Sequence, residues 1–170
     1  QTTVDGRSVA QLTSPDGSNG IALTRAFATS GVVGHVLETR ARWSGGSDGI
    51  LAAFTDNSLN ATYSDLPDNG YITYLFRHYN SRSGLIRMVN AGAAGSGEWS
   101  VPDGGAVDQW YVASLRWYGD TLTAERDRQT VTTAPAQAFA SLSHVHISTL
   151  AATWNFDWVL VRKGAAVDSV

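Results

Sequence analysis

The stretch QWYVASLRWYGDTLTAERD, residues 109–127, contains two runs of alternating side chains separated by a short turn. In the second run, Leu122 and Ala124 occupy alternate positions, and polar or charged residues fill the positions between and around them. Apolar side chains at every second position indicate a strand with one buried face. Gly119 and Asp120 join the two runs, which is typical of a tight hairpin with a positive φ angle at Gly119. The stretch therefore predicts an antiparallel β-hairpin.

The same period of two continues through most of the chain. Between residues 35 and 43, apolar side chains and Trp43 alternate with Glu38, Arg40 and Arg42, which predicts another half-buried strand. Strands are predicted at residues 8–13, 20–27, 35–43, 48–54, 70–79, 85–90, 109–117, 121–127, 142–150 and 155–163. Turn-forming Pro, Gly, Asp and Asn residues separate them. Short strands at this spacing, with no convincing helix, predict an all-β fold: a two-sheet antiparallel β-sandwich or jelly roll.

Length and composition narrow the class of protein. A chain of 170 residues fits one domain over residues 1–170, and the tail 164–170, which loses the pattern, is expected to be an extended segment or a linker. The net charge of -3 argues against a nucleic-acid partner, which would need a basic face. The sequence contains no apolar run long enough to predict a membrane span. The absence of cysteine excludes disulfides, thiol nucleophiles and Cys-ligated zinc.

The order of these segments resembles the concanavalin-A-like lectin and laminin-G-like superfamily of jelly rolls. The resemblance rests on LETRARW at residues 37–43, GYITYLF at 70–76, LIRMVN at 85–90 and FDWVLVR at 156–162, and it extends over almost the whole chain. It implies a concanavalin-A-like sandwich of the kind found in microbial surface proteins and carbohydrate-binding modules. The superfamily also contains adhesins, glycosidases, polysaccharide lyases and assembly modules, so the resemblance leaves the function open.

The sequence lacks the motifs of the enzymes in this superfamily, so we expect no catalytic activity. A glycosidase needs two carboxylates on either side of the scissile bond. The Glu-x-Asp-x-x-Glu run that supplies them in laminarinase-like members is absent, and Glu38, Glu98 and Glu125 each stand alone in a strand. The Gln-x-His triplet of the lyases is also absent; the nearest match is His144-Val145-His146. A polysaccharide lyase is therefore less favoured than a binding or structural module, and a glycosidase is less favoured still.

Residues 71–80, YITYLFRHYN, are the part of the chain richest in residues that could bind sugar. Aromatic rings stack on the apolar faces of sugars, while neighbouring polar side chains hydrogen-bond to the hydroxyl groups. We expect Tyr71, Arg77 and Tyr79 to share an exposed face beside Arg87, and Trp99 to form an exposed platform near a loop. The remaining tryptophans are assigned to the core: Trp43, Trp110, Trp117, Trp154 and Trp158.

Asp157 lies in an apolar closing strand, where a carboxylate should be paired, hydrogen-bonded or metal-bound. The resemblance implies that Asp157 helps to hold a structural Ca²⁺ ion together with loop carbonyls and an acid such as Asp5 or Asp16. The alternatives are that it bonds to backbone amides or to arginine, or faces solvent. His144 and His146 share a strand face and could ligate a metal, but a polar outer face is the more ordinary interpretation.

Two functions from different classes remain open. The first is a non-catalytic, extracellular or cell-surface module that binds a polysaccharide or glycan or mediates adhesion; a glycosylation triplet at Asn60 fits such a location. The second is a structural subunit of a surface filament, appendage or viral particle. In that case the apolar closing strand would pair with copies of itself or with neighbouring domains by strand addition.

Overall fold

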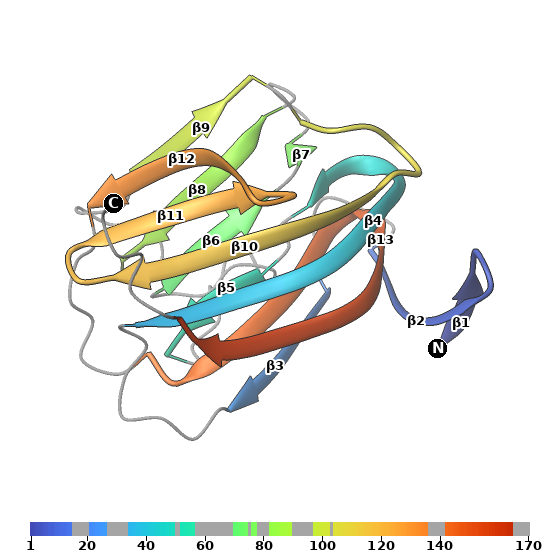
Figure 1. Cartoon of the computed structure of the whole chain (residues 1–170). Coiled ribbons are helices and arrows are strands. Elements are labelled where there is room, and N and C mark those ends of the chain that lie inside the picture. Colours follow the sequence, from blue (N-terminus) through green and yellow to red (C-terminus); the bar gives the residue numbers. More distant parts are fainter. Residues whose placement is uncertain are drawn as a thin grey trace.

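The computed structural model describes residues 1–14, 21–26, 34–49, 52–56, 70–74, 76–77, 82–89, 97–102, 104–135 and 142–164 of the chain (Figure 1). Within these residues the regular elements are all strands, and every pairing between them is antiparallel. The predicted all-β sandwich is therefore confirmed. The strands are β1 (Thr2–Val4), β2 (Arg7–Thr13), β3 (Ile21–Ala26), β4 (His35–Gly49), β5 (Ala52–Thr55), β6 (Gly70–Tyr74), β7 (Phe76–Arg77), β8 (Ser83–Met88), β9 (Gly97–Val101), β10 (Trp110–Tyr118), β11 (Thr121–Arg126), β12 (Gln129–Pro135) and β13 (His144–Lys163).

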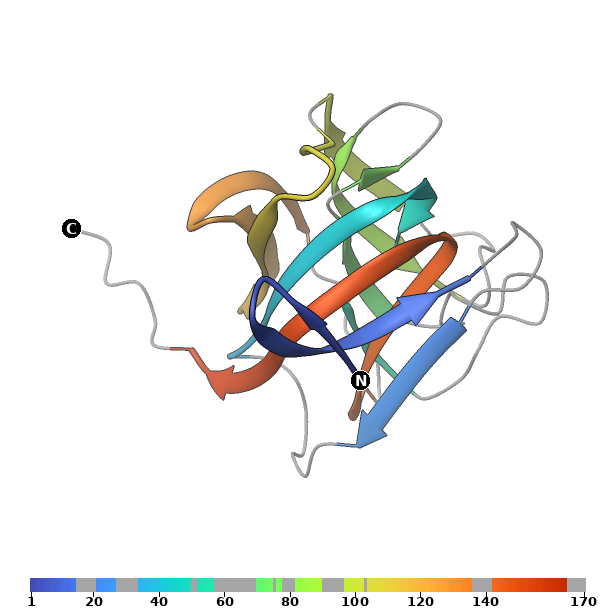
Figure 2. The same ribbon diagram turned by 90° about the vertical axis from the view of Figure 1, so that its right-hand side faces the viewer.

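The strands form two layers that share β13. One layer, here called the front sheet, has the order β12-β11-β10-β4-β13-β2, with β1 paired to β2. The other, the back sheet, has the order β9-β8-β6-β5-β13-β3. Residues 144–149 of β13 lie in the back sheet between β3 and β5, and residues 152–163 lie in the front sheet beside β4. Figure 2 shows the molecule from the side, with β2 and β3 flanking the two parts of β13.

The bend between the two parts of β13 lies at Ala151, which has a φ of 46°. The sequence predicted two strands here, 142–150 and 155–163, whereas the structure has one strand that changes sheet. Gly46 of β4 lies opposite Ala152 and has a φ of 101°. A Cβ atom on Gly46 would lie 2.3 Å from the Ala151 carbonyl oxygen, so the two backbones approach closely where β13 turns.

The core lies between the two sheets and confirms most of the predicted inward positions. Leu37, Ala41 and Trp43 are buried on β4, and Leu122 and Ala124 are buried on β11, as their alternation predicted. The sandwich is completed by buried side chains from both sheets: Phe54, Leu85, Leu115, Trp117, Ile147, Trp154 and Phe156. Among the described residues, no helix is long and apolar enough to cross a membrane.

Two tryptophans assigned to the core lie elsewhere. Trp110 is half-buried and lies on the face of β10 opposite to that of the core residues Tyr111 and Ala113. Trp158 is 38% exposed. A β-bulge between Phe156 and Trp158 inserts an extra residue, so Trp158 turns to the face opposite that of Phe156. Both tryptophans therefore lie on the face that the two-residue strand period assigns to them, once the extra residue in β13 is counted.

Candidate functional site

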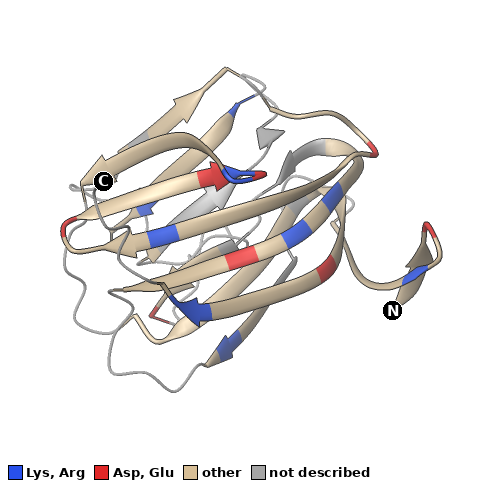
Figure 3. Ribbon diagram, viewed as in Figure 1, with Lys and Arg blue, Asp and Glu red and all other residues tan. Residues whose placement is uncertain are grey.

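The outer face of the front sheet carries a concentrated set of charged and aromatic side chains. Figure 3 shows charged residues along β4, β10, β11 and β13 on this side of the molecule. On β4, Glu38, Arg40 and Arg42 alternate with buried core residues and therefore point outward. Trp110 on β10 and Trp158 on β13 flank β4 on the same face. We refer to Arg7, Arg40, Trp110, Asp157 and Trp158 as the Trp–Arg surface.

Arg40 lies at the centre of the Trp–Arg surface. Its guanidinium carbon is 4.5 Å from the centroid of the Trp110 ring, a distance suited to a cation–π interaction. Its Nη1 atom donates to Oδ2 of Asp157 at 2.5 Å, and the same oxygen accepts from Nη1 of Arg7 at 3.1 Å. In the β4–β13 ladder, Arg40 lies directly opposite Trp158. The Arg40 side chain therefore contacts Trp110 and Asp157, and its backbone pairs with that of Trp158.

Asp157 is paired with two arginines, Arg7 and Arg40. The sequence allowed arginine pairing as an alternative to metal binding. Its side chain is 12% exposed, while Arg40 and Arg7 are 24% and 58% exposed. A carboxylate this far from water needs a countercharge, which Arg40 supplies from the sheet and Arg7 from the solvent side. The Asp157 side chain is thus built into the protein's own hydrogen-bond network.

Trp110 is fixed from a second direction. Its Nε1 atom donates to Oδ2 of Asp5 at 2.9 Å. Arg42 donates to the same Asp5 oxygen and, through Nη2, to Oδ1 of Asp108, both at 2.9 Å. The indole is therefore held at its ring by Arg40 and at its nitrogen by Asp5, which fixes its orientation before any ligand binds.

The rest of this face is neutralised by further ion pairs. Arg162 donates through Nε and Nη2 to the two oxygens of Glu38 at 3.2 and 2.9 Å. The hydrogen bond to Glu38 raises the pKa of Arg162 above its ordinary value. Arg116 donates through Nε to Glu125 at 2.8 Å. Because these acids are paired with arginine, the described part of this face offers hydrogen-bonding groups and aromatic rings with charges of both signs.

Two acids of the expected calcium site have partners within the protein. Asp157 is paired with two arginines, and Asp5 accepts from Arg42 and the Trp110 indole. Calcium requires six to eight oxygen ligands, and these two carboxylates are already held by cationic or N–H donors. In the part of the chain that the structure describes, no three His, Cys, Asp or Glu residues gather as a metal site. Asp16 lies outside the described residues, and calcium binding stays a prediction.

Only part of the predicted sugar-binding set can be placed. Arg87 lies with its guanidinium carbon 5.4 Å from the centroid of the Trp99 ring, so these two members of the predicted set contact each other. Trp99 is partly buried and packs against the core, however, and is not the exposed platform that was expected. The backbone of Tyr71 lies opposite Arg87, and that of Arg77 lies opposite Asp48.

The side chains of Tyr71 and Arg77 lie outside the described parts, as do the predicted residues Tyr79 and Asn60.

The two histidines are half-buried or buried, contrary to the expected polar outer face. His146 is fully buried, and its Nδ1 atom is 3.1 Å from Oγ1 of Thr24. The Nδ1 atom of His144 is 2.9 Å from Oγ of Ser143.

Comparison with known proteins identifies the fold. No protein-family model matches the sequence, and no curated protein matches it. Among solved structures, the carbohydrate-binding module CBM66 from Bacillus subtilis aligns with a TM-score of 0.64 and 16% identity, covering 92% of this chain and 91% of that one. The carbohydrate recognition domain of Emp46p in its metal-free form aligns with a TM-score of 0.65 and 12% identity, covering 89% and 81%.

A β-glucanase from Bacillus licheniformis also aligns, with a TM-score of 0.57 and 15% identity over 94% of this chain and 79% of that one. At these identities the likeness concerns the backbone fold, and the neighbours include both binding domains and an enzyme. Together with the two antiparallel sheets and the shared strand β13, these alignments show that the chain has the concanavalin-A-like jelly-roll fold.

Proposed function

We propose that this chain is a non-catalytic carbohydrate-binding module that works outside the cell or at its surface, and that it binds glycan on the Trp–Arg surface. The observation that carries the proposal is the placement of Trp110 and Trp158 on one outer sheet face, on either side of Arg40. Aromatic rings supply stacking area for sugar rings, and charged side chains between them supply hydrogen bonds. The similarity to a carbohydrate-binding module and a carbohydrate recognition domain supports this assignment.

The geometry favours a glycan chain over a single sugar. Trp110 and Trp158 lie on the two strands that flank β4. Neighbouring strands are roughly 4.8 Å apart, so the two strands are roughly 10 Å apart, and the two tryptophans are also offset by two residues along β4. This separation exceeds the width of one sugar ring. An oligosaccharide lying across the strands could contact both rings and reach Arg7, which is 58% exposed at the edge.

The charged groups favour binding over hydrolysis. A glycosidase needs one carboxyl group as a general acid and a second as a nucleophile or base, roughly 5–9.5 Å apart. On this surface, Asp157 and Glu38 each accept hydrogen bonds from arginine. The arginines occupy carboxylate oxygens that a glycosidase would need to reach the glycosidic bond or the attacking water. The similarity to a β-glucanase is therefore interpreted as shared fold.

The test is a glycan array followed by calorimetric titration of any positive polysaccharide. The native chain should bind a defined glycan, and the Trp158→Ala variant should lose about five- to tenfold in affinity if a ring stack worth roughly 1–1.5 kcal/mol is removed. Val107→Ala is the matched control, because Val107 is 48% exposed and is not part of the Trp–Arg surface. Binding that both variants retain would move the site elsewhere, and no binding across the array would contradict the proposed function.

A further inference from the structure

The second half of β13 forms an edge of the front sheet. On one side, residues 158–163 pair with β4. On the other side, β2 pairs with β13 only from Thr153 to Phe156. Within the described residues, no strand pairs with this side beyond Phe156. An edge of this kind presents a row of backbone N–H and C=O groups that can pair with another strand.

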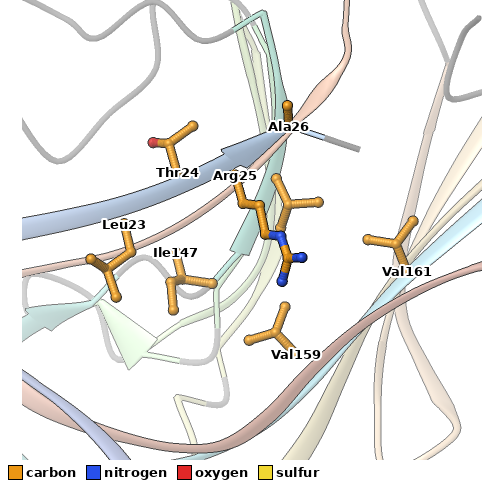
Figure 4. Close-up of a pocket in the computed structure, with 8 residues that line it drawn as sticks. Leu23, Thr24, Arg25, Ala26, Ile147, Val159 and Val161 are labelled. Carbon is orange, nitrogen blue, oxygen red and sulfur yellow. The ribbon is translucent and has the colours of Figure 1, made fainter. Parts of the chain in front are cut away.

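This edge is unusually apolar for an exposed strand. Trp158 and Val159 are each 38% exposed, and Leu160 is 46% exposed. Val159 and Val161 face a groove of about 510 Å³ whose other side is formed by β3 and the first half of β13, including Leu23 (Figure 4). Exposed sheet edges are commonly protected by charge, proline or very short length, yet the middle of this edge carries none of these.

The sequence of the edge complements itself when reversed. Residues 157–163 read DWVLVRK, with an acid at one end, bases at the other and Leu160 in the middle. We propose that a second copy of this chain pairs antiparallel with this edge about a two-fold axis at Leu160. The front sheets of the two copies then form one continuous sheet. The interface is isologous, as two-fold symmetry requires, because each copy contributes the same strand.

Backbone polarity permits this register. The N–H of Gly164 donates to the carbonyl of Gly34, the residue immediately before β4, at 2.8 Å. Backbone groups alternate in direction along an antiparallel strand, so the even-numbered residues from 158 to 164 face β4. Val159 and Val161 therefore direct their N–H and C=O groups toward the open edge. With the axis at Leu160, Val159 of each copy lies opposite Val161 of the other, and the two form a hydrogen-bonded pair.

Side-chain contacts select this register from its neighbours. With the axis at Leu160, Trp158 of each copy lies opposite Arg162 of the other on the outer face, where an arginine can stack on the indole. The valines lie opposite valines on the groove side. Axes at Val159 or Val161 are also compatible with the backbone, but they place Trp158 opposite Leu160 or Gly164 and lose this match. An odd shift in register would turn side chains to the wrong face.

A single cysteine tests the axis directly, because the native chain contains none. In the proposed dimer the two Leu160 residues form a non-hydrogen-bonded pair with Cα atoms about 4.5 Å apart, within the usual disulfide range. Leu160→Cys should form a covalent dimer on mild oxidation at micromolar concentration. Val107→Cys, equally exposed but away from the edge, should remain mostly monomeric. Equal cross-linking of both variants, or none at residue 160, would overturn the proposed axis.

A charge pair provides the second test. Leu160→Glu and Leu160→Lys each place like charges opposite each other, and each should be monomeric in sedimentation at concentrations where the native chain is a dimer. An equimolar mixture of the two should restore the dimer, a result that misfolded variants could not give. A native chain that stays monomeric at its highest soluble concentration, or that forms assemblies larger than a dimer through this edge, would refute the closed two-fold arrangement.

Discussion

The guanidinium carbon of Arg40 lies 4.5 Å from the centroid of the Trp110 ring, while the same guanidinium donates to Asp157. The arginine thus serves a packing role and an electrostatic role at once. Because it is 24% exposed, its contacts are shielded from water more than those of an ordinary surface ion pair. The result is a surface whose aromatic ring is already oriented in the unbound protein.

Replacing Trp110 should separate the contribution of its ring from that of its N–H group. Trp110→Phe keeps an aromatic ring but removes the donor to Asp5, so glycan affinity should fall only a few-fold. Trp110→Ala removes the ring and should lower affinity by about tenfold or more. Isothermal titration with the same glycan measures both. Equal losses in the two variants would show that the hydrogen bond, and not stacking, dominates.

The two arginines of Asp157 should contribute unequally to stability. Arg40→Met leaves a partly buried carboxylate with one exposed partner and should reduce the free energy of unfolding by about 1–2 kcal/mol. Arg7→Met removes a partner that is 58% exposed, so the change should stay within about 0.5 kcal/mol. Urea denaturation followed by tryptophan fluorescence compares them. A larger loss for Arg7→Met would reverse this assignment.

Ala151→Gly should stabilise the protein. Ala151 adopts a φ of 46°, a left-handed conformation that costs an L residue about 1–2 kcal/mol. Glycine removes this cost but loses more backbone entropy on folding, so the net gain should be about 0.5 kcal/mol. Ala113→Gly is the control: Ala113 is buried in a strand, and its replacement should destabilise. Destabilisation by both variants would mean that the Ala151 methyl group contributes more than the strain costs.

Gly46 and Gly119 should respond differently to alanine. Both have positive φ angles, but a Cβ atom on Gly119 would meet no atom within 4 Å, whereas one on Gly46 would lie 2.3 Å from backbone. Gly119→Ala should therefore cost only the conformational strain, about 1 kcal/mol. Gly46→Ala adds a backbone clash at the bend and should cost at least about 3 kcal/mol. Similar thermal midpoints for the two variants would contradict the close approach of β4 and β13.

Calcium should not stabilise the chain through Asp157. Since this carboxylate is already held by Arg40 and Arg7, we expect Asp157→Asn to leave the effect of calcium on the thermal midpoint unchanged. Thermal unfolding with calcium and with EDTA, for the native chain and the variant, measures this. A calcium-dependent rise in the native midpoint that the variant abolishes would restore the metal site that the sequence suggested.

Strand periodicity predicted the fold and several buried faces. Leu37, Ala41 and Trp43 point inward as their spacing required, because one face of a sandwich strand must be covered. The same rule, applied to β10, places Trp110 on the outer face with the polar side, so this part of the candidate surface could be derived from the sequence. The assignment of Trp110 to the core relied on its residue type instead, and this is why it was wrong.

Other features have no signal in a local pattern. The bulge before Trp158 changes the face of every later residue in β13, and a bulge is determined by the partner strand. At the bend, Ala151 is a non-glycine residue with a positive φ angle, and no turn motif in the sequence predicts it. The contact between Arg40 and Asp157 joins residues 117 positions apart, so only the folded sheet brings them together.

The shared strand β13 also has a consequence for the order of folding. It pairs with β2, β3, β4 and β5, so it connects segments from the first third of the chain with its last strand. Contacts of such long sequence separation are slow to form, because a large loop must close before they contribute. During synthesis the two layers cannot be joined until residues 144–163 leave the ribosome. Until then the edges of β4 and β5 that pair with β13 stay open, and a chaperone that covers them would prevent pairing with other strands.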